Sequence, residues 1–383
     1  MREYNLFVDA HVFDGIFQGS RTFLKGIYSN FDTKKYSIKI YLAANNIENL
    51  KDEFRGVENI EFIKLQSKNK FIRLAYEIPM LISKLKIDFA HFNYYLPLFL
   101  NKDCSYIVTI HDVIFLDYPQ YFPKSYFLKN KILFEIAAKR ADLLNSVSVY
   151  SAMRIKEKFE LDKVIDVIPN AIDEKYHTHA DKVNDKNYIN KKFGISNYLL
   201  YVSRLEPRKN HMTLLRTYDE LRLWEQDIEL LFIGKKAMEN LELDCYFEEI
   251  KTKSNGKVHH LEYVNNEDLM IFYNAATIAC FPSLCEGFGI PPLESAAIKT
   301  PTICSNLTAM QEFQFFGKFH IDPTNKVELK YIVAQTLEDI KSGLIYSEMD
   351  YISKVIIEKY KWKNTADLLG ESIKKKIEDR KIL

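Results

Sequence analysis

The stretch with the clearest chemical pattern runs from Phe281 to Ala297, FPSLCEGFGIPPLESAA. An apolar, strand-like run is followed by a loop with two glycines and then by Pro291 and Pro292. Proline suits the first turn of a helix because it has no N–H to donate and its φ is already helical. The pattern therefore predicts a strand, a glycine loop and the start of a helix.

The backbone of this loop is suited to holding an anion. We expect the amides of Gly287, Phe288, Gly289 and Ile290 to point, together with the helix N-terminus, beyond the carboxyl end of the strand. Backbone amides next to glycines, together with the positive end of a helix dipole, bind phosphate in many α/β proteins.

Two carboxylates flank the loop, Glu286 before the glycines and Glu294 after them. A phosphate site does not need carboxylates, which are better used to accept hydrogen bonds from hydroxyls. Phosphate together with a polyol suggests a nucleotide sugar. We expect Glu294 in the first turn of the helix. The alternative is that Glu294 only caps that helix and that the glycines only make a turn, because short motifs also match by chance.

A second cluster lies in YVSRLEPRKNHMTLLRTY, Tyr201 to Tyr218, where a strand gives way to a helix. Three cations fall at this junction: Arg204, Arg208 and Lys209. Arginine engages a diphosphate through a planar fork, and lysine acts as a point charge. The alternative is a solvated charged loop.

The elements that must position these residues alternate between short apolar strands and helices, as in βαβ units on parallel sheets. The expected strands are YNLFVD, SIKIYLA, IEFIKL, DFAHF, YIVTI, LLNSVS and IDVIP in the first half, and YLLYV, ELLFIG, VHHLEY, TIACFP, PTICS and FHIDP in the second. Helices are expected at Phe71–Leu85 and Tyr126–Arg140, and over the last stretch from about Ser347. Residues 173–197 are polar and predict a linker with at most one short helix. The plain expectation is an α/β chain with two doubly wound domains, whose strand ends could face one cleft.

The composition narrows the classes of protein. The 383 residues hold 53 Lys and Arg against 52 Asp and Glu, so the formal net charge of +1 gives no sign of a general nucleic-acid binder. The five cysteines are scattered without a C-x-x-C pair, which suits a reducing cytosol. No signal-peptide pattern and no apolar run long enough to cross a bilayer is visible, so we expect a cytoplasmic protein. No D-x-D or H-E-x-x-H motif suggests a metal site, and we expect none.

These motifs resemble those of the retaining nucleotide-sugar glycosyltransferases of family 4, also called group 1 glycosyltransferases. The resemblance rests on SRLEPRKN, on CEGFGIPPLE with its two glutamates separated by seven residues, and on TIHDVIFLDYPQYF, VIPNAID and VNNEDLMIFYNAATIACFPS. It implies the GT-B architecture of two Rossmann-like domains facing an interdomain cleft. The implied domains are residues 1–175 on the acceptor side and 190–349 on the donor side, with a C-terminal helix over 350–383 that packs back on the first domain.

The resemblance also implies roles for the site residues. Glu286 would bind donor-sugar hydroxyls, Glu294 the ribose, and Arg204 with Lys209 the diphosphate leaving group, with Arg208 beside them. The amides of residues 287–290 would support phosphate and sugar. From the first domain, His111 would touch the donor sugar, and Gly19 would lie near phosphate and acceptor. By itself, a histidine at a strand end such as His111 is more often a structural hydrogen-bonding residue. Three positions depart from the family pattern: Ser203, Ala171 and Ile298–Lys299, where glycine is usual.

The implied function is retaining, metal-independent transfer of a hexose from a nucleotide-diphosphate sugar, GDP-mannose-like or UDP-hexose, with no cofactor. The acceptor would be a saccharide or lipid-linked saccharide in cell-surface polysaccharide or lipopolysaccharide (O-antigen) synthesis. The alternatives are a non-catalytic sugar-nucleotide-binding partner of a transferase, or a GT-B relative such as an epimerase or phosphorylase. The basic stretches Lys68–Ile87 and Tyr121–Arg140 leave a peripheral contact with the inner face of the plasma membrane open. Packing on the first sheet is the favoured interpretation of Lys68–Ile87, whereas Tyr121–Arg140 suits either packing or membrane contact.

Overall fold

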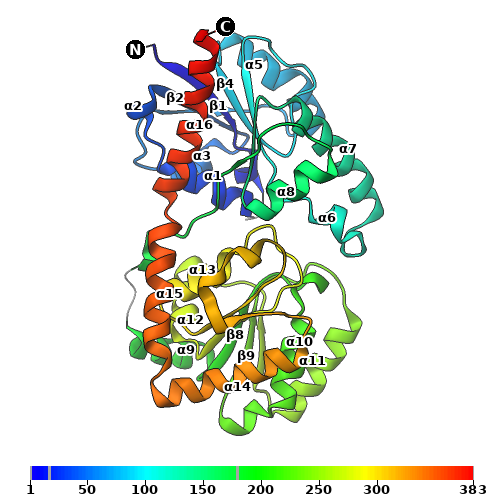
Figure 1. The fold of residues 1–383 in the computed structure, drawn as a ribbon, viewed down its shortest axis with the longest axis vertical. Coiled ribbons are helices and arrows are strands. Elements are labelled where there is room, and N and C mark those ends of the chain that lie inside the picture. The colour runs from blue at the N-terminus through cyan, green and yellow to red at the C-terminus, as the bar shows by residue number, and fades with distance from the viewer. Residues whose placement is uncertain (1, 16–18, 178–180, 383) are drawn as a thin grey trace. The chain divides into compact units, whose positions relative to one another are not determined.

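The computed structural model describes residues 2–15, 19–177 and 181–382 of the chain. The chain divides into two compact units. Unit 1 consists of Met1–Ala171 and Trp362–Leu383, and unit 2 consists of Ile172–Lys361. Each unit is an α/β domain built around one parallel sheet (Figure 1).

The sheet of unit 1 has seven described strands in the order β3-β2-β1-β4-β5-β6-β7, all parallel to their neighbours. The strands are β1 (Tyr4–Asp9), β2 (Ile38–Ala44), β3 (Ile60–Lys64), β4 (Phe89–Asn93), β5 (Ser105–Thr109), β6 (Leu143–Ser146) and β7 (Asp166–Val167). The central strands β4 and β5 are buried along their whole length. Burial on both faces is why these strands are near-continuous apolar runs in the sequence. The strand order reverses between β1 and β4, where the first switch point of this sheet lies.

Helices cover both faces of this sheet. They are α1 (Gly19–Ser29), α2 (Thr33–Tyr36), α3 (Ile47–Glu53), α4 (Lys70–Ile72), α5 (Ile78–Lys84), α6 (Ile114–Asp117), α7 (Lys124–Arg140), α8 (Val149–Lys158) and α16 (Trp362–Ile382), with a π-helical turn at Arg73–Glu77 between α4 and α5 and a 3-10 turn at His11–Asp14. The C-terminal α16 packs on α1 (Figure 1). Gly26 of α1 allows this close approach, because a Cβ there would collide with the ring of Trp362, and Gly370 of α16 likewise leaves room for the ring of Tyr36 at the end of α2.

The sheet of unit 2 has six described strands in the order β10-β9-β8-β11-β12-β13, which is the Rossmann order. They are β8 (Tyr198–Val202), β9 (Glu229–Ile233), β10 (Val258–Leu261), β11 (Ile278–Phe281), β12 (Thr302–Ser305) and β13 (His320–Ile321). The order reverses between β8 and β11, and ligands of such sheets bind beyond the carboxyl ends of the strands at that point.

The helices of unit 2 are α9 (Lys182–Phe193), α10 (His211–Glu220), α11 (Leu241–Lys253), α12 (Asn266–Ala275), α13 (Ile290–Ala297), α14 (Lys326–Ser342) and α15 (Ile345–Lys359). Unit 2 also contains short 3-10 turns at Glu174–His177, Pro207–Lys209 and Thr308–Glu312. The α/β fold class with two Rossmann-like sheets is confirmed, and each strand expected from the sequence is present.

The expectation of a polar linker with at most one short helix over residues 173–197 is met only in part, because the helix there is longer than expected. Residues 182–193 form α9, which begins at the N-cap Asp181 and ends at Gly194 in the left-handed region. The helix packs on α12, and Asp268 accepts hydrogen bonds from Tyr188 and Lys192. The caps were visible in the sequence, but the apolar period was weak because the buried residues of α9 are few, Ile189 being the buried apolar one and Asp185 a buried polar one.

Two further expectations change. Glu294 is the fifth residue of α13 and lies beyond the first turn, because the helix already begins at Ile290. The C-terminal stretch is not one helix but two, α15 and α16, which are separated at Tyr360 and Lys361. Only the part from Trp362 groups with unit 1.

Candidate active site

Two loops of unit 2 meet at the switch point of its sheet. One follows β8 and carries Arg204 to Lys209, and the other follows β11 and carries Glu286 to Gly289. The amide of Leu284 donates to the carbonyl oxygen of Arg208 over 2.8 Å, which joins the two loops directly. The side chains at this junction are therefore fixed relative to one another by the backbone.

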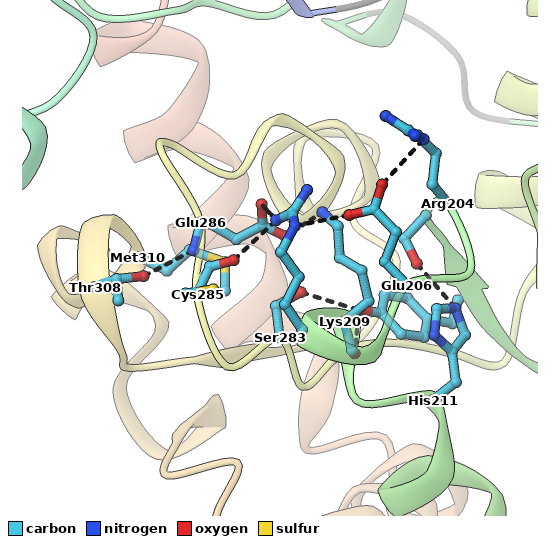
Figure 2. Close-up of polar contacts among 12 residues, drawn as sticks. Arg204, Glu206, Lys209, His211, Ser283, Cys285, Glu286, Thr308 and Met310 are labelled. Carbon is cyan, nitrogen blue, oxygen red and sulfur yellow. Dashed lines mark hydrogen bonds and ion pairs between the residues drawn. The ribbon is translucent and has the colours of Figure 1, made fainter. Parts of the chain in front are cut away.

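An ion-paired cluster lies at the centre of this junction (Figure 2). The carboxylate of Glu286 accepts hydrogen bonds from the Lys209 ammonium and from Nη1 of Arg208, the latter over 3.2 Å. Lys209, Arg208 and Glu286 expose only 13–17% of their side chains. The structure thus brings together three residues that the sequence predicted for the site.

Glu206 continues the cluster on its other side. Its carboxylate pairs with Nε of Arg208 over 2.7 Å and with Nε of Arg204 over 3.1 Å (Figure 2). Three cations therefore share two carboxylates, which leaves one net positive charge. Because the Arg204 side chain is 62% exposed while the others are buried, that charge is presented to solvent on Arg204.

Hydrogen bonds that involve hydroxyls and backbone groups support the cluster. The Tyr201 hydroxyl donates to the carbonyl oxygen of Lys209 over 2.6 Å and lies 2.9 Å from the Ser283 hydroxyl. The amide of Glu286 donates to the hydroxyl of Thr308 over 2.8 Å. These contacts fix the backbone on both sides of the Lys209–Glu286 pair.

The electrostatics of the cluster keep Glu286 ionised. Burial alone would raise its pKa, but the adjacent charges of Lys209 and Arg208 and the hydrogen bonds that they donate outweigh burial and lower the pKa to about 2. Glu286 is therefore a carboxylate at any physiological pH and acts as a hydrogen-bond acceptor rather than as a proton donor.

The glycine loop has the geometry expected of an anion site. Gly289 is the N-cap of α13 with φ 110°, in the region that favours glycine, and a Cβ there would lie 2.8 Å from the Met310 side chain. Pro291 and Pro292 occupy the first turn, as predicted. In the described part of the chain the amides of Phe288, Gly289 and Ile290 donate to no protein oxygen, so the helix N-terminus keeps free donors.

Two tyrosines act on Glu294. The Tyr273 hydroxyl donates to Oε2 of Glu294 over 3.2 Å, and Tyr176 also lowers the pKa of the carboxyl group. Burial raises the pKa of Glu294 to about 7, despite these tyrosines and the charge of Lys175. The two glutamates of the motif thus differ in state, one firmly ionised and one that titrates near neutrality.

The residues predicted in unit 1 lie near the carboxyl end of its sheet. His111 follows β5 and is buried, with Nε2 3.0 Å from Oδ1 of Asn93 and its ring against Phe23 and Tyr94. Burial lowers the pKa of His111 to about 3, so the ring is neutral at physiological pH. Gly19 is the first residue of α1, and a Cβ there would meet no described atom within 4 Å. Packing therefore gives no reason for glycine at this position.

Sequence reasoning missed the residues that support the two glutamates. Glu206 was visible in the EPRK string, but its bridge between two arginines depends on side-chain direction. Tyr273, Tyr176 and Thr308 reach the site from α12 and from 3-10 turns distant in sequence, and no local motif marks them. Only a signal that links residues about 20 or more positions apart could have found them.

The described residues, 2–15, 19–177 and 181–382, lack both a metal-binding cluster and a membrane-spanning helix. No group of three or more His, Cys, Asp or Glu side chains there is arranged to hold a metal ion. No helix in the same residues is both long and apolar enough to cross a membrane.

The Rossmann-like sheets with a basic, glycine-bearing switch point define a class of nucleotide-binding transferase, and comparison with known proteins specifies it. Residues 184–349 match the family model of group 1 glycosyl transferases, and residues 27–176 match that of glycosyltransferase family 4. Together the two matches cover most of the chain. The chain therefore belongs to the group 1 glycosyltransferases of family 4 and is a nucleotide-sugar glycosyltransferase with the GT-B fold.

Individual relatives agree with this family. The chain is 26% identical over 338 residues to the O-antigen chain mannosyltransferase B of Escherichia coli, covering 79% of this chain and 85% of that enzyme. It is 26% identical to the serotype-specific mannosyltransferase WbdA of Escherichia coli over 61% of this chain, but spans only 29% of that longer protein. Among solved structures, Anabaena Alr3699/HepE in complex with UDP and glucose superposes with a TM-score of 0.69 at 16% identity, covering 97% of this chain and 99% of that one.

Proposed function

We propose that this enzyme transfers a hexose, with retention of configuration, from a nucleotide-diphosphate sugar to a saccharide or lipid-linked saccharide acceptor in cell-surface polysaccharide synthesis. The observation that carries the proposal is the Arg208–Lys209–Glu286 cluster beside the free amides of α13. A mannose donor such as GDP-mannose is favoured because the Escherichia coli relatives are mannosyltransferases. A UDP-hexose is the second candidate, because HepE was solved with UDP.

Leaving-group stabilisation is the step that the cluster is built to perform. When the bond between the sugar carbon and the phosphate oxygen breaks, negative charge develops on the diphosphate. Arg204 presents an exposed guanidinium, and the ammonium of Lys209 is held in place by Glu286. Preorganised cations of this kind stabilise the developing charge without having to reorient during the reaction.

The transfer itself is proposed to occur on the front face of the donor sugar. The acceptor hydroxyl oxygen bonds to the sugar carbon as the bond to phosphate breaks, and the hydroxyl proton passes to an oxygen of the leaving phosphate. Neither Glu286, which stays ionised, nor His111, which stays neutral, needs to donate a proton in this scheme. The protein contributes position and charge.

Ribose binding is assigned to Glu294. A carboxylate at the fifth residue of α13 can accept hydrogen bonds from both ribose hydroxyls, and the hydrogen bond from Tyr273 and the proximity of Tyr176 favour the carboxylate form. Tyr273 and Tyr176 are therefore proposed as positioning residues for Glu294.

The direct test is a binding panel followed by a transfer assay. Thermal shifts of the purified chain with GDP, UDP, ADP and dTDP identify the base, and transfer or hydrolysis of the matching nucleotide sugar then tests catalysis. The proposal expects one diphosphate to stabilise the chain and turnover to persist after chelation with EDTA. A chain that binds the diphosphate but neither transfers nor hydrolyses the sugar is instead a non-catalytic partner, and 2-epimerisation of the donor would identify an epimerase.

Peripheral contact with an anionic membrane is a further part of the proposal. The helix α7 exposes apolar side chains at Leu128 and Ile132 and carries basic residues at both ends. Such a surface favours anionic lipid. Sedimentation with phosphatidylglycerol vesicles at low salt tests the contact, with Leu128→Asp as the disrupting variant and pure phosphatidylcholine vesicles as the control. Equal sedimentation of variant and parent would contradict it.

A further inference from the structure

Unit 1 contains a buried cation that the proposed chemistry does not use. Arg73 lies in the π-helical turn Arg73–Glu77 and is only 5% exposed. Its Nε is buried without a hydrogen-bond partner among the described residues, and no ion pair within 4.0 Å is found for its guanidinium there. Burial of a charge without a close partner is costly, so such an arginine in a folded protein needs an explanation.

A second cation lies on the preceding turn. The Nζ atom of Lys70 is 3.1 Å from the centre of the Tyr95 ring, and the Tyr95 hydroxyl donates to Asn130 of α7 over 2.6 Å. Burial, together with the positive charges of Lys129 and Arg73, lowers the pKa of Lys70 to about 8. The positive charges of Arg73 and of Lys129 on α7 therefore both act on Lys70.

Little negative charge compensates this cluster. Asp9 is the acidic group that acts on both Lys70 and Arg73. Its carboxylate is already paired with His11, whose Nδ1 lies 3.0 Å from Oδ2. Burial raises the pKa of Asp9, but His11 and Arg73 outweigh burial and lower it, so Asp9 counts as one negative charge. The three positive charges of Lys70, Arg73 and Lys129 thus outnumber the one negative charge of Asp9 by two, even with His11 neutral.

The cluster lies at the switch point of the unit 1 sheet. Asp9 is the last residue of β1, Tyr95 follows the end of β4, and these two strands are neighbours across the reversal of strand order. Ligands of doubly wound sheets bind outside the carboxyl ends of the strands at this position. Single π-helical turns within α-helices, such as the one that carries Arg73, are also frequent at functional sites.

We propose that Lys70, Arg73 and Lys129 form a binding subsite for an anionic group, a phosphate or a carboxylate, on the acceptor substrate. The subsite rests on the proposed function in one respect, namely that an acceptor binds to unit 1. An anion between Arg73 and Lys70 would supply the missing acceptor for the guanidinium and neutralise the mutual repulsion of the cations. Arginine and lysine are the side chains that proteins use for such groups.

The test is direct binding of soluble anions to the full-length chain. Inorganic pyrophosphate is the probe for a phosphate group and glucuronate the probe for a carboxylate, both titrated calorimetrically with the unit 2 site saturated by its nucleoside diphosphate. The variants are Lys70→Ala, Arg73→Ala and Lys129→Ala. Lys84→Ala is the matched control, because it removes an exposed charge from the end of α5, which follows the same π-helical turn.

The expected result is that at least one probe binds the parent chain and that Lys70→Ala and Arg73→Ala each weaken it by about tenfold or more, as expected for loss of a charge-assisted contact. Lys129→Ala should have a smaller effect and Lys84→Ala none. Nucleoside diphosphate affinity and nucleotide-sugar hydrolysis should stay unchanged in all variants. Failure of nucleotide binding in the parent would count against the proposed function, whereas the anion measurement can still be read separately.

Two further measurements control for misfolding of the variants and for binding to a lipid surface. If Arg73→Ala fails to fold, Arg73→Lys should retain binding, and the partly exposed Lys70 still tests the subsite. Binding to vesicles of phosphatidylglycerol and of phosphatidylcholine is measured as well, because it distinguishes a discrete anion subsite from a surface that binds lipid. The proposal is overturned if neither soluble anion binds the parent, if the variants bind like the parent, or if only vesicles bind and Lys84→Ala weakens that binding as much as Lys70→Ala.

Discussion

The ammonium of Lys209 donates a hydrogen bond to the carboxylate of Glu286, and these residues come from loops that follow different strands of the unit 2 sheet. The contact is buried, and Arg208 approaches the same carboxylate from the other side. One glutamate therefore fixes two cations at the switch point. This relationship explains why a carboxylate belongs in a site whose ligand is negatively charged.

We expect Lys209→Ala and Glu286→Ala each to lower turnover at least about tenfold, which corresponds to about 1.4 kcal/mol of transition-state stabilisation. In the proposed mechanism Lys209 supplies charge to the leaving diphosphate, and without Glu286 that charge is no longer held in place. The measurement is kcat for nucleotide-sugar hydrolysis or transfer. Lys235→Ala, a lysine at the end of another strand of the same sheet, is the control. Near-normal turnover in either site variant would refute the assigned roles.

The pH dependence of nucleotide binding should report Glu294. Because burial raises its pKa to about 7, the carboxylate form becomes populated as the pH rises from 6 to 8, and affinity for a ribonucleotide should increase over that range. Tyr273→Phe removes a hydrogen bond that favours the carboxylate, so the midpoint should move to higher pH.

The control for this prediction is the matching 2′-deoxynucleoside diphosphate. Its phosphates titrate in the same way, but it lacks one hydroxyl that Glu294 would bind. The difference in affinity between the two nucleotides should vary with pH in the parent and be constant in Glu294→Gln. A pH-independent difference in the parent would remove Glu294 from the ribose site.

The stability of the chain should depend on Glu286 in acid. Its pKa falls from 4.5 to about 2 on folding, so its ionised form stabilises the native state above pH 4.5, and this contribution is lost as the pH falls toward 2. Glu286→Gln leaves the Lys209 ammonium without its carboxylate partner, while Arg208 keeps Glu206, and should cost about 3 kcal/mol at pH 7. Denaturant unfolding at pH 7 and pH 3 should show a smaller difference between variant and parent at the lower pH. A difference that does not shrink in acid would contradict this account.

Gly289→Ala should impair both folding and nucleotide binding. The backbone there has φ 110°, and the new Cβ would meet the Met310 side chain at 2.8 Å, so we expect a loss of about 2 kcal/mol or more. Gly19→Ala is the matched comparison, because a Cβ meets no described atom there. Gly19→Ala should leave the melting temperature unchanged, and any loss of transfer would then report contact with a ligand. An unaffected Gly289→Ala protein would disprove the steric argument.

The sequence by itself determined the strands, the two sheets and the identity of the charged site residues. Buried parallel strands such as β4 and β5 must be apolar on both faces, and prolines such as Pro291 mark the first turn of a helix, so both signals are local. The same local signals placed Glu286, Arg208 and Lys209 at strand ends.

Only the tertiary structure decided what those charges do to one another. Nothing in the sequence indicated that Glu286 is firmly ionised whereas Glu294 titrates near neutrality, because that difference comes from the charges of Lys209 and Arg208 beside Glu286 and from the burial of Glu294. It also left Arg73 among the basic residues of an amphipathic helix, although its guanidinium is buried. Burial and electrostatic neighbours depend on residues far apart in the chain, and a linear pattern does not record which of them meet.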